Sequence, residues 1–300
     1  MDLISNLLRT FHLNSNVFKH ARFCGQWSLD TTGSGYAGFH LVADGQCWLH
    51  RPDGTEPMLL RSGDLLILPR DAPHVLSDSP VAHPGAAADM RPLGDRSVAG
   101  TDIVCGFFQF DDDVANPLLD VLPDYLVIHS DAPGTGAMRR IVELLVSEAA
   151  EATPGVDAVL DRLSDALFIQ AIRAYLRTAT GTGLAAALAD PAVHAALRLM
   201  HESPGRDWTM AALARDVAVS RSSFAQRFAA ALGEPPMAYL ARWRMTLARR
   251  LLREGMTVAE VAERCGYESE AGFAKAFKRV TGTGPGAVRQ AGRLSRNDRR

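Results

Sequence analysis

The chain has 300 residues, of which 47% are hydrophobic and 22% charged, as in ordinary soluble globular proteins. Because 300 residues exceed what one core usually supports, we expect two domains. The net charge of −2 conceals an asymmetry: residues 201–300 hold 18 Arg and Lys against 10 Asp and Glu, whereas residues 1–200 hold 14 against 24. This pattern predicts that the basic third meets a polyanion and that the acidic remainder does not.

Other features exclude secreted and membrane proteins. The first residues, MDLISNLLRTFHLNSN, lack the pattern of a secretory signal, and no apolar run approaches the roughly 20 residues that span a bilayer. Cys24, Cys47, Cys105 and Cys265 are scattered and form no CxxC pair, which favours reduced thiols over disulfides or a zinc knuckle. We therefore expect a cytoplasmic protein without a membrane partner.

The chain changes character near its middle. Residues 20–80 and 101–110 alternate apolar runs with DG, PDG and SGD turns, which predicts strands, while residues 81–100 have no period and predict a long loop. Residues 135–151 and 156–178 carry apolar residues at helical spacing, and the chain after Pro191 is helical nearly to its end. We predict an α+β protein with four parts: a β-barrel at 1–130, a helical connector at 131–183, a linker at 184–190 and an all-α domain at 191–300.

The last third contains a weak internal repeat. MAALARDVAVSRSSFAQRFAAALGEPP lines up with VAEVAERCGYESEAGFAKAFKRVTGTGP, and a long helix lies between the two copies. In each copy a short helix, a tight turn and a second helix capped by Ser220 or Ser269 follow one another. Phe224 and Phe228, like their counterparts in the second copy, mark the buried face of the second helix. The repeat predicts two helix-turn-helix units, at about 208–232 and 257–281.

The face opposite the Phe pairs is free to enter a DNA groove. Gln can read adenine, Arg and Lys can read guanine or phosphate, and Ala can touch a thymine methyl group. We expect phosphate contacts from Arg221, Arg227, Lys278 and Arg279, and base contacts from Ser222, Gln226, Ala271 and Lys275. The full candidate DNA-binding set is Arg221, Ser222, Ser223, Gln226, Arg227, Ser269, Glu270, Ala271, Lys275, Lys278 and Arg279.

Residues 208–289 resemble the DNA-binding domain of the AraC/XylS family of bacterial transcription regulators. The matching pieces are LARDVAVSRSSFAQRF, LGEPPMAYLARWRMTLARRLL and VAERCGYESEAGFAKAFKRVTGTGP, with Phe224 where Leu is usual and Val288 where an aromatic residue is common. The resemblance implies two recognition helices in successive major grooves of promoter DNA, set by the rigid helix between them. It also implies a homodimer, and RNA polymerase as a partner if the protein is an activator.

The stretch SGDLLILPRDAPHVLSD, residues 62–78, is similar to the second of the two cupin motifs, with Asp in place of the usual Gly and Asn. The resemblance extends over about residues 20–110 and implies a small β-barrel that senses a small-molecule effector. The expected pocket would be lined from inward-facing strand residues. Our candidate ligand-binding residues are His40, Trp48, His74, Cys105 and Phe107.

We expect His74 to form hydrogen bonds at the start of a strand rather than to bind a metal ion. The region that should supply a His-x-His pair and a Glu, DTTGSGYAGFH, offers no such pair. A barrel could bring His40, His74 and Cys105 together, but sequence cannot show whether they converge. We therefore expect no required cofactor.

Alternatives remain for both parts of the chain. Helix 156–178 carries Asp157, Asp161, Arg162, Asp165 and Arg173 on its expected outer face, and it could pack on its own barrel or form a dimer. The main hypothesis is a ligand-responsive transcription regulator rather than an enzyme. The rivals are a metal-dependent cupin enzyme fused to a helical domain, and a DNA-binding protein whose barrel serves only for pairing.

Overall fold

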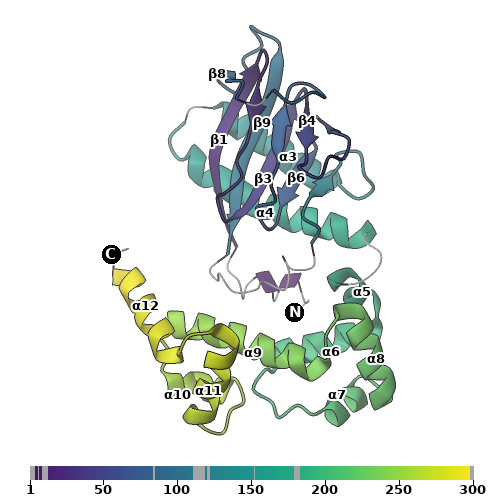
Figure 1. Ribbon diagram of the computed structural model, residues 1–300, viewed down its shortest axis with the longest axis vertical. Coiled ribbons are helices and arrows are strands. Elements are labelled where there is room, and N and C mark those ends of the chain that lie inside the picture. Colours follow the sequence, from purple (N-terminus) through teal and green to yellow (C-terminus); the bar gives the residue numbers. More distant parts are fainter. Residues whose placement is uncertain are drawn as a thin grey trace. The chain divides into compact units, whose positions relative to one another are not determined.

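The computed structural model describes residues 4–5, 7–8, 13–83, 85–110, 119, 122–151, 153–178 and 183–297, with side chains described as far as residue 293. The described residues divide into two compact units (Figure 1). The first unit holds residues 13–110 and 122–178, and the second holds residues 183–297 together with the short described stretches near the N-terminus and residue 119. Among these residues no helix has both the length and the apolar character of a membrane span.

The first unit is built from two antiparallel sheets. The six-stranded sheet has the order β10-β6-β3-β9-β1-β8, and the four-stranded sheet has the order β2-β7-β4-β5. The larger sheet consists of β1 (Asn14–Cys24), β3 (Ala37–Asp44), β6 (Leu65–Leu68), β8 (Asp89–Arg91), β9 (Gly100–Gln109) and β10 (Leu126–Ile128). The smaller sheet consists of β2 (Ser28–Leu29), β4 (Gln46–His50), β5 (Met58–Arg61) and β7 (Val75–Ser77). The strand-rich domain expected from the sequence is confirmed.

The core lies between the two sheets. Strand β9 shows how it forms, because alternate side chains of a strand point to opposite faces. Ile103 and Cys105 belong to the buried cluster shared with Leu49 of β4, whereas Phe108 on the other face packs its ring 4.6 Å from the ring of Phe168. Strand β9 is therefore covered on both faces and reads as a nearly continuous apolar run.

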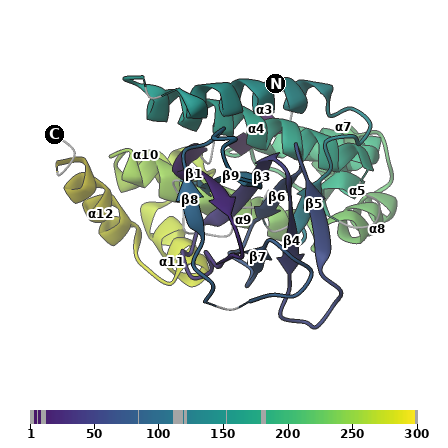
Figure 2. The same cartoon turned by 90° about the horizontal axis from the view of Figure 1, so that it is seen from above.

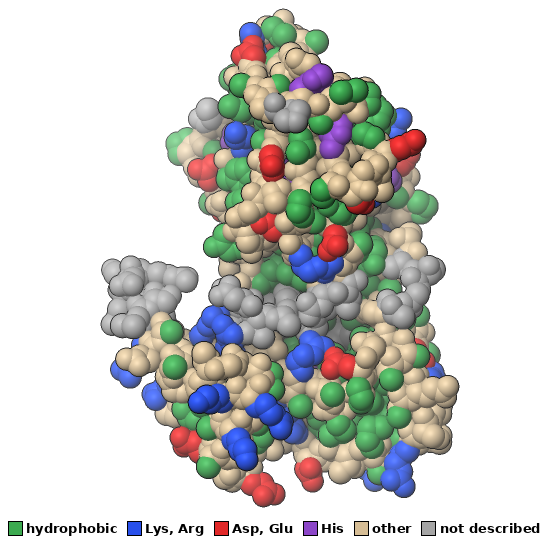
Figure 3. Space-filling view, in the orientation of Figure 1, with side chains coloured by type: hydrophobic (Ala, Val, Ile, Leu, Met, Phe, Trp, Pro, Cys, Tyr) green, Lys and Arg blue, Asp and Glu red, His purple; other side chains and the backbone are tan. Residues whose placement is uncertain are grey.

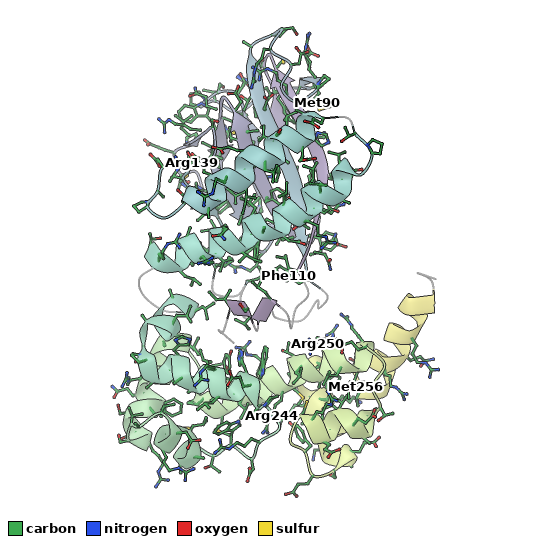
Figure 4. All side chains as sticks on the ribbon, turned by 180° about the vertical axis from the view of Figure 1, so that it is seen from behind. Met90, Phe110, Arg139, Arg244, Arg250 and Met256 are labelled. Atoms are coloured by element: carbon green, nitrogen blue, oxygen red, sulfur yellow. The ribbon has the colours of Figure 1, made fainter. Side chains whose placement is uncertain are left out.

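Two helices, α3 (Gly136–Ala150) and α4 (Val156–Thr178), lie side by side along the outer face of the larger sheet (Figures 2 and 4). Leu160, Leu167 and Phe168 of α4 are buried. Helix α4 thus packs on its own domain, which is one of the two alternatives that the sequence left open.

Two acidic residues of α4 differ from expectation. Asp161 and Asp165 were assigned to the outer face, but the Asp161 carboxylate accepts the backbone N–H of Val17 at 3.1 Å and Asp165 accepts the hydroxyl of Ser15 at 2.7 Å. The register between β1 and β9 shifts between Val17 and Lys19, and the N–H of Val17 is satisfied by the helix. These carboxylates therefore fasten α4 to β1.

Two segments expected to be irregular form regular structure. Strand β8 lies within the predicted loop 81–100 and pairs with β1 over only three residues, too few to leave a period in the sequence. The predicted linker 184–190 contains helix α5 (Leu184–Ala189), in which Leu184 and Ala187 are buried, and it ends at Asp190. The sequence misses α5 because a six-residue Leu and Ala segment has no resolvable helical period.

The second unit is helical, as predicted, and contains both helix-turn-helix units. The first helix-turn-helix unit is α7–α8, the second helix-turn-helix unit is α10–α11, and α9 joins them. After α5 the helices are α6 (Pro191–Glu202), α7 (Met210–Asp216), α8 (Arg221–Leu232), α9 (Pro236–Arg253), α10 (Val258–Arg264), α11 (Glu270–Thr281) and α12 (Pro285–Asn297).

The two turns have the same construction. In the first, Ala218 adopts a left-handed backbone with φ of 57° and the N–H of Val219 donates to the carbonyl of Ala214 at 3.0 Å. In the second, Gly266 has φ of 75° and the N–H of Tyr267 donates to Ala262 at 2.9 Å. The repeat seen in the sequence is therefore a repeat of backbone conformation.

Candidate nucleic-acid interface and polar sensor cluster

Helix α8 buries one face and exposes the other as the Phe spacing predicts. Phe224 and Phe228 are fully buried, and the hydroxyl of Ser220 caps the helix by accepting the N–H of Ser223 at 3.2 Å. Arg221, Ser222 and Gln226 are exposed, while Ser223 is partly buried. Arg221 has no ion-pair partner among the described residues, so its guanidinium is available to phosphate.

Arg227, expected on the free face of α8, has its guanidinium paired with an acidic residue of the same unit. Its Nε and Nη2 atoms donate to the two carboxylate oxygens of Asp190, each at 2.7 Å, and this paired contact lowers the pKa of Asp190. The same carboxylate caps α6 by accepting the N–H groups of Ala192 and Val193 at 2.9 and 3.0 Å. The guanidinium of Arg227 therefore joins α8 to the start of α6 and is paired with a carboxylate, unlike that of Arg221.

Helix α11 follows the same design with a more basic face. Phe273 and Phe277 are fully buried, and the hydroxyl of Ser269 accepts the N–H of Gly272 at 3.1 Å. No ion pair is formed within the described chain by the cationic side chains of α11. The exposed candidates on this helix are Ser269, Glu270, Ala271, Lys275, Lys278 and Arg279. Figure 3 shows Lys and Arg side chains gathered over the part of the second unit where Figure 1 places α10 and α11.

The polar candidates of the first unit converge in its interior. The Nε2 atoms of His40 (β3) and His74 lie 2.9 Å apart, and the hydroxyl of Thr31 is 3.2 Å from each of them. The other ring nitrogen of His40 is 3.0 Å from the sulfur of Cys105 on β9. Cys105 is fully buried, and His40 and His74 are nearly so. The sequence raised this convergence as an open possibility, and strand pairing between β3 and β9 at His40 and Cys105 produces it.

Hydrogen bonding fixes a neutral arrangement. The Nδ1 atom of His74 is 2.9 Å from the carbonyl of Ala72, so this nitrogen carries the proton and Nε2 of His74 accepts. His40 must then donate through its Nε2 and accept through Nδ1 from the thiol of Cys105. Burial lowers the pKa of His40 to about 3, lowers that of His74, and raises that of the Cys105 thiol. The cluster is a chain of uncharged donors and acceptors.

This donor set fits a hydrogen-bond chain better than a metal. His40 uses one nitrogen toward Cys105 and the other toward His74, so the three side chains do not point at one common position. Within the part of the chain that the structure describes, no group of three or more His, Cys, Asp or Glu side chains could hold a metal ion.

The two remaining ligand candidates, Phe107 and Trp48, lie on different faces of the strands and do not meet. Phe107 of β9 lies toward one end of the same inner face and stacks on Phe18 of β1, with ring centroids 4.6 Å apart. Tyr36 is 5.7 Å from Phe107 by the same measure, and Phe18 and Tyr36 are exposed. Trp48 lies outside this group, because its neighbours Cys47 and Leu49 on β4 enter the core and alternation turns Trp48 to the other face. Sequence reasoning missed Phe18, Thr31 and Tyr36, since single aromatic or hydroxyl residues carry no pattern.

The first unit also has an open hollow of about 650 Å³ beside α3. Its lining includes Ser62 and Gly63, which begin the cupin-like motif, and Ser130, Arg139 and Val142, and none of these was a candidate ligand-binding residue. Figure 4 labels Arg139 on α3, whose guanidinium donates to the carbonyl of Ser130 at 3.1 Å. The hollow is formed by different residues from those of the polar cluster.

Comparison with known proteins assigns both units. Residues 2–177 match the family model described as Cupin, and residues 213–291 match the one described as Helix-turn-helix domain. A putative AraC-like transcription regulator of Streptomyces lividans is 32% identical, with 97% of this chain and 98% of that protein covered. The RCS-specific HTH-type transcriptional activator RclR of Escherichia coli is 31% identical, with 97% and 98% covered. The crystal structure of the DNA-binding domain of AdpA with a target DNA is 32% identical over 36% of this chain and 97% of that one, with a TM-score of 0.34.

Proposed function

Since the chain belongs to the family of AraC-like transcription regulators, with a cupin domain and a DNA-binding helix-turn-helix domain, we propose that its first unit binds a small-molecule effector. Binding of the effector changes the affinity of the second unit for promoter DNA. The observation that carries this proposal is the buried, uncharged chain formed by Thr31, His40, His74 and Cys105.

A polar chain in an apolar core calls for an explanation. Well-packed apolar residues of similar volume stabilise a core at least as well as buried polar groups, which must all be satisfied. Here the cluster lies on the inner face of the larger sheet, and Phe107, stacked on Phe18, lies on the same face. Donors, acceptors and aromatic rings side by side suit a small organic molecule with a few polar groups.

The effector must bind two states unequally, because equal affinity would shift no equilibrium. A molecule that replaces the hydrogen bond between the two imidazoles with its own would favour one arrangement of β3 and the segment that carries His74. We propose that this rearrangement of β3 and the His74 segment changes the affinity of the second unit for DNA.

We also propose that the working form is a homodimer. Leu144 on α3 and Val159 on α4 are 48% and 39% exposed on the side of the helices away from the sheet. Pairing through these helices would place two DNA-binding domains on one promoter, each on its own binding site. Activation would additionally require contact with RNA polymerase.

Two observations disfavour the alternative of a cupin enzyme. The curated relatives that match the full chain are transcription regulators. In addition, burial raises the pKa of the Cys105 thiol, so the cysteine of the cluster is held away from the thiolate form that a nucleophile needs.

The first experiment measures binding of the full chain to the promoter region beside its own gene, across a salt series. We expect sequence-selective binding with a log–log salt slope set by the number of phosphate contacts. Equal affinity for the promoter and for unrelated DNA would contradict the regulatory function.

The second experiment screens small molecules by thermal shift and then tests each hit for a change in DNA affinity. We expect His74→Gln and Phe107→Ala to abolish the shift while leaving DNA binding without effector unchanged. Trp48→Phe serves as the matched control, because Trp48 lies on the opposite face of its sheet. Hits that act equally on all three variants would place the effector elsewhere, the hollow beside α3 being the next site to test.

A further inference from the structure

The second helix-turn-helix unit contacts the chain just before the first one, at a point outside the helix that joins the two. The loop between α6 and α7 reaches the turn of the second unit, where Gly205 and Gly266 meet. A Cβ atom built on Gly205 would lie 2.6 Å from the carbonyl oxygen of Arg264, and one on Gly266 would lie 2.5 Å from the carbonyl oxygen of Gly205. The two backbones are therefore in direct contact with no room for a side chain.

Arg244 of α9 holds this contact in place. Its Nε atom donates to the carbonyl of Pro204 at 2.7 Å, and its Nη2 atom donates to the carbonyl of Arg206 at 2.8 Å. The thiol of Cys265, next to Gly266, donates in turn to the backbone carbonyl of Arg244 at 3.4 Å. Figure 4 shows Arg244 near the middle of α9, between the helices of the two units.

The loop is itself fixed to the first helix-turn-helix unit. The guanidinium of Arg206 stacks 4.0 Å from the ring of Trp208 and pairs with Asp216 of α7 at 3.0 Å. The indole N–H of Trp208 donates to the carbonyl of Ser203 at 2.9 Å, and Trp208 is only 3% exposed. Movement of the loop would therefore require movement of α7 and, with it, α8.

We propose that Gly205, Gly266 and Arg244 form a clasp that fixes the distance and orientation between the recognition helices α8 and α11. Helix α9 alone connects the units by one path, and a single helix can bend. The clasp adds a second path and makes the pair rigid. Gly205 and Arg244 are thus positioning residues that determine which spacing the protein accepts between two half-sites, the DNA segment contacted by α8 and the DNA segment contacted by α11 of the same chain.

The physical reason lies in the geometry of DNA. Inserting one base pair between the half-sites moves one by about 3.4 Å and rotates it by about a tenth of a turn. A rigid pair of recognition helices cannot follow this displacement, whereas a flexible pair can. The inference rests on the DNA-binding function of the second unit and adds to it the source of spacing selectivity.

The test uses the full-length protein and its best binding site, obtained by selection from random DNA with the wild type. Affinity is then measured on that site and on versions with one base pair inserted or removed between the half-sites. Gly205→Ala and Arg244→Lys remove the close approach and the paired hydrogen bonds, respectively. Gly286→Ala is the matched control, since a Cβ there would meet no atom within 4 Å.

We expect the wild type and the control to prefer the selected spacing strongly. In both clasp variants the ratio of affinities for selected and shifted sites should fall about tenfold, with base preference inside each half-site unchanged. Arg244→Lys keeps the charge and serves if Gly205→Ala does not fold, as thermal unfolding would show. An unchanged ratio in a folded variant, with or without a general loss of affinity, would overturn the proposal.

Discussion

Arg227 shows how a residue on a helix-turn-helix segment can be engaged in a contact within the protein. By sequence position it falls near the free face of α8, and its charge suggests a phosphate contact. The structure places its guanidinium on Asp190, which also caps α6, so one carboxylate satisfies three backbone and side-chain partners. Six residues separate it from Arg221, so the two side chains point about 120° apart around the helix axis, and that rotation decides which of the two cations meets Asp190.

Changing Arg227 and changing Lys278 should therefore have different signatures. We expect Lys278→Gln to flatten the salt dependence of DNA binding by about 0.9 in log–log slope, because one phosphate contact is lost. Arg227→Gln should leave the slope unchanged and lower the thermal midpoint of the second unit. Parallel salt titrations and thermal unfolding of both variants test this. If Arg227→Gln flattens the slope as much as Lys278→Gln does, Arg227 contacts phosphate after all.

The turn of the first helix-turn-helix unit contains a residue under local strain. Ala218 has φ of 57°, a left-handed conformation that an L-residue with a side chain adopts at a cost of about 1–2 kcal/mol. Its counterpart in the second helix-turn-helix unit, Gly266, avoids this cost because glycine has no side chain.

Ala218→Gly should consequently raise the free energy of unfolding of the second unit by about 0.5–1 kcal/mol, the strain relief being partly offset by the greater freedom of glycine in the unfolded chain. Urea unfolding followed by circular dichroism measures it. The reverse change, Gly266→Ala, should destabilise, since it adds both strain and a clash with Gly205. A loss of stability in Ala218→Gly would show that the Cβ contributes packing that outweighs the strain.

At the scale of elements, α5 is the clearest departure from expectation. The sequence GTGLAAALADP reads as a linker, yet Leu184–Ala189 forms a helix that packs on α6 and α8. The N–H of Gly183 donates to the carbonyl of Ala231 near the end of α8 at 2.6 Å. A recognition helix is thus supported from a segment that appears dispensable in sequence.

This contact predicts how fragments of the protein will behave. A fragment of residues 183–300 should fold and bind DNA, whereas one of residues 191–300 should be less stable, because it lacks α5 and the carboxylate of Asp190 that caps α6 and pairs with Arg227. Thermal unfolding and DNA binding of the two fragments provide the comparison. Equal midpoints would mean that residues 184–190 behave as the linker that the sequence suggested.

At the scale of the whole molecule, buried imidazoles occur in both units. Burial lowers the pKa of His40 to about 3 in the first unit and that of His201 to about 3 in the second, and it lowers the pKa of His74. His201 stacks on Trp243 with ring centroids 3.8 Å apart and hydrogen-bonds the hydroxyl of Tyr239 at 2.8 Å. Each of these residues is neutral in the folded protein.

Acid should therefore destabilise both units well above the range where carboxylates titrate. Below about pH 6.5 the unfolded chain binds protons at His40 and His201 and the folded chain does not, so stability falls as pH decreases toward 3, and the lowered pKa of His74 adds to this fall in the first unit. His40 and His201 each contribute a slope of about 1.4 kcal/mol per pH unit. Urea unfolding at pH 7.5, 6.5 and 5.5 measures it, and His201→Gln should reduce the slope of the second unit alone. Stability that is constant across this range would mean that the buried histidines gain protons when folded.

The sequence alone determined the features that are local or repeated. Two copies of one helix-turn-helix pattern, with their Ser caps and Phe pairs, are readable because they depend on spacing along the chain, and the structure confirms both. The strand-rich domain is readable from its turns in the same way. Membership of the family follows from these patterns in order.

Only the tertiary structure decided what depends on contact between distant segments. The chain from Thr31 to Cys105 forms because β3 and β9 pair in one register, and a shift by one residue would turn Cys105 outward. The ion pair of Arg227, the outward position of Trp48 and the approach of Gly205 to Gly266 likewise join residues whose sequence separation carries no signal. Spacing along the chain predicts which face a residue occupies on its own element, and packing between elements decides what that face meets.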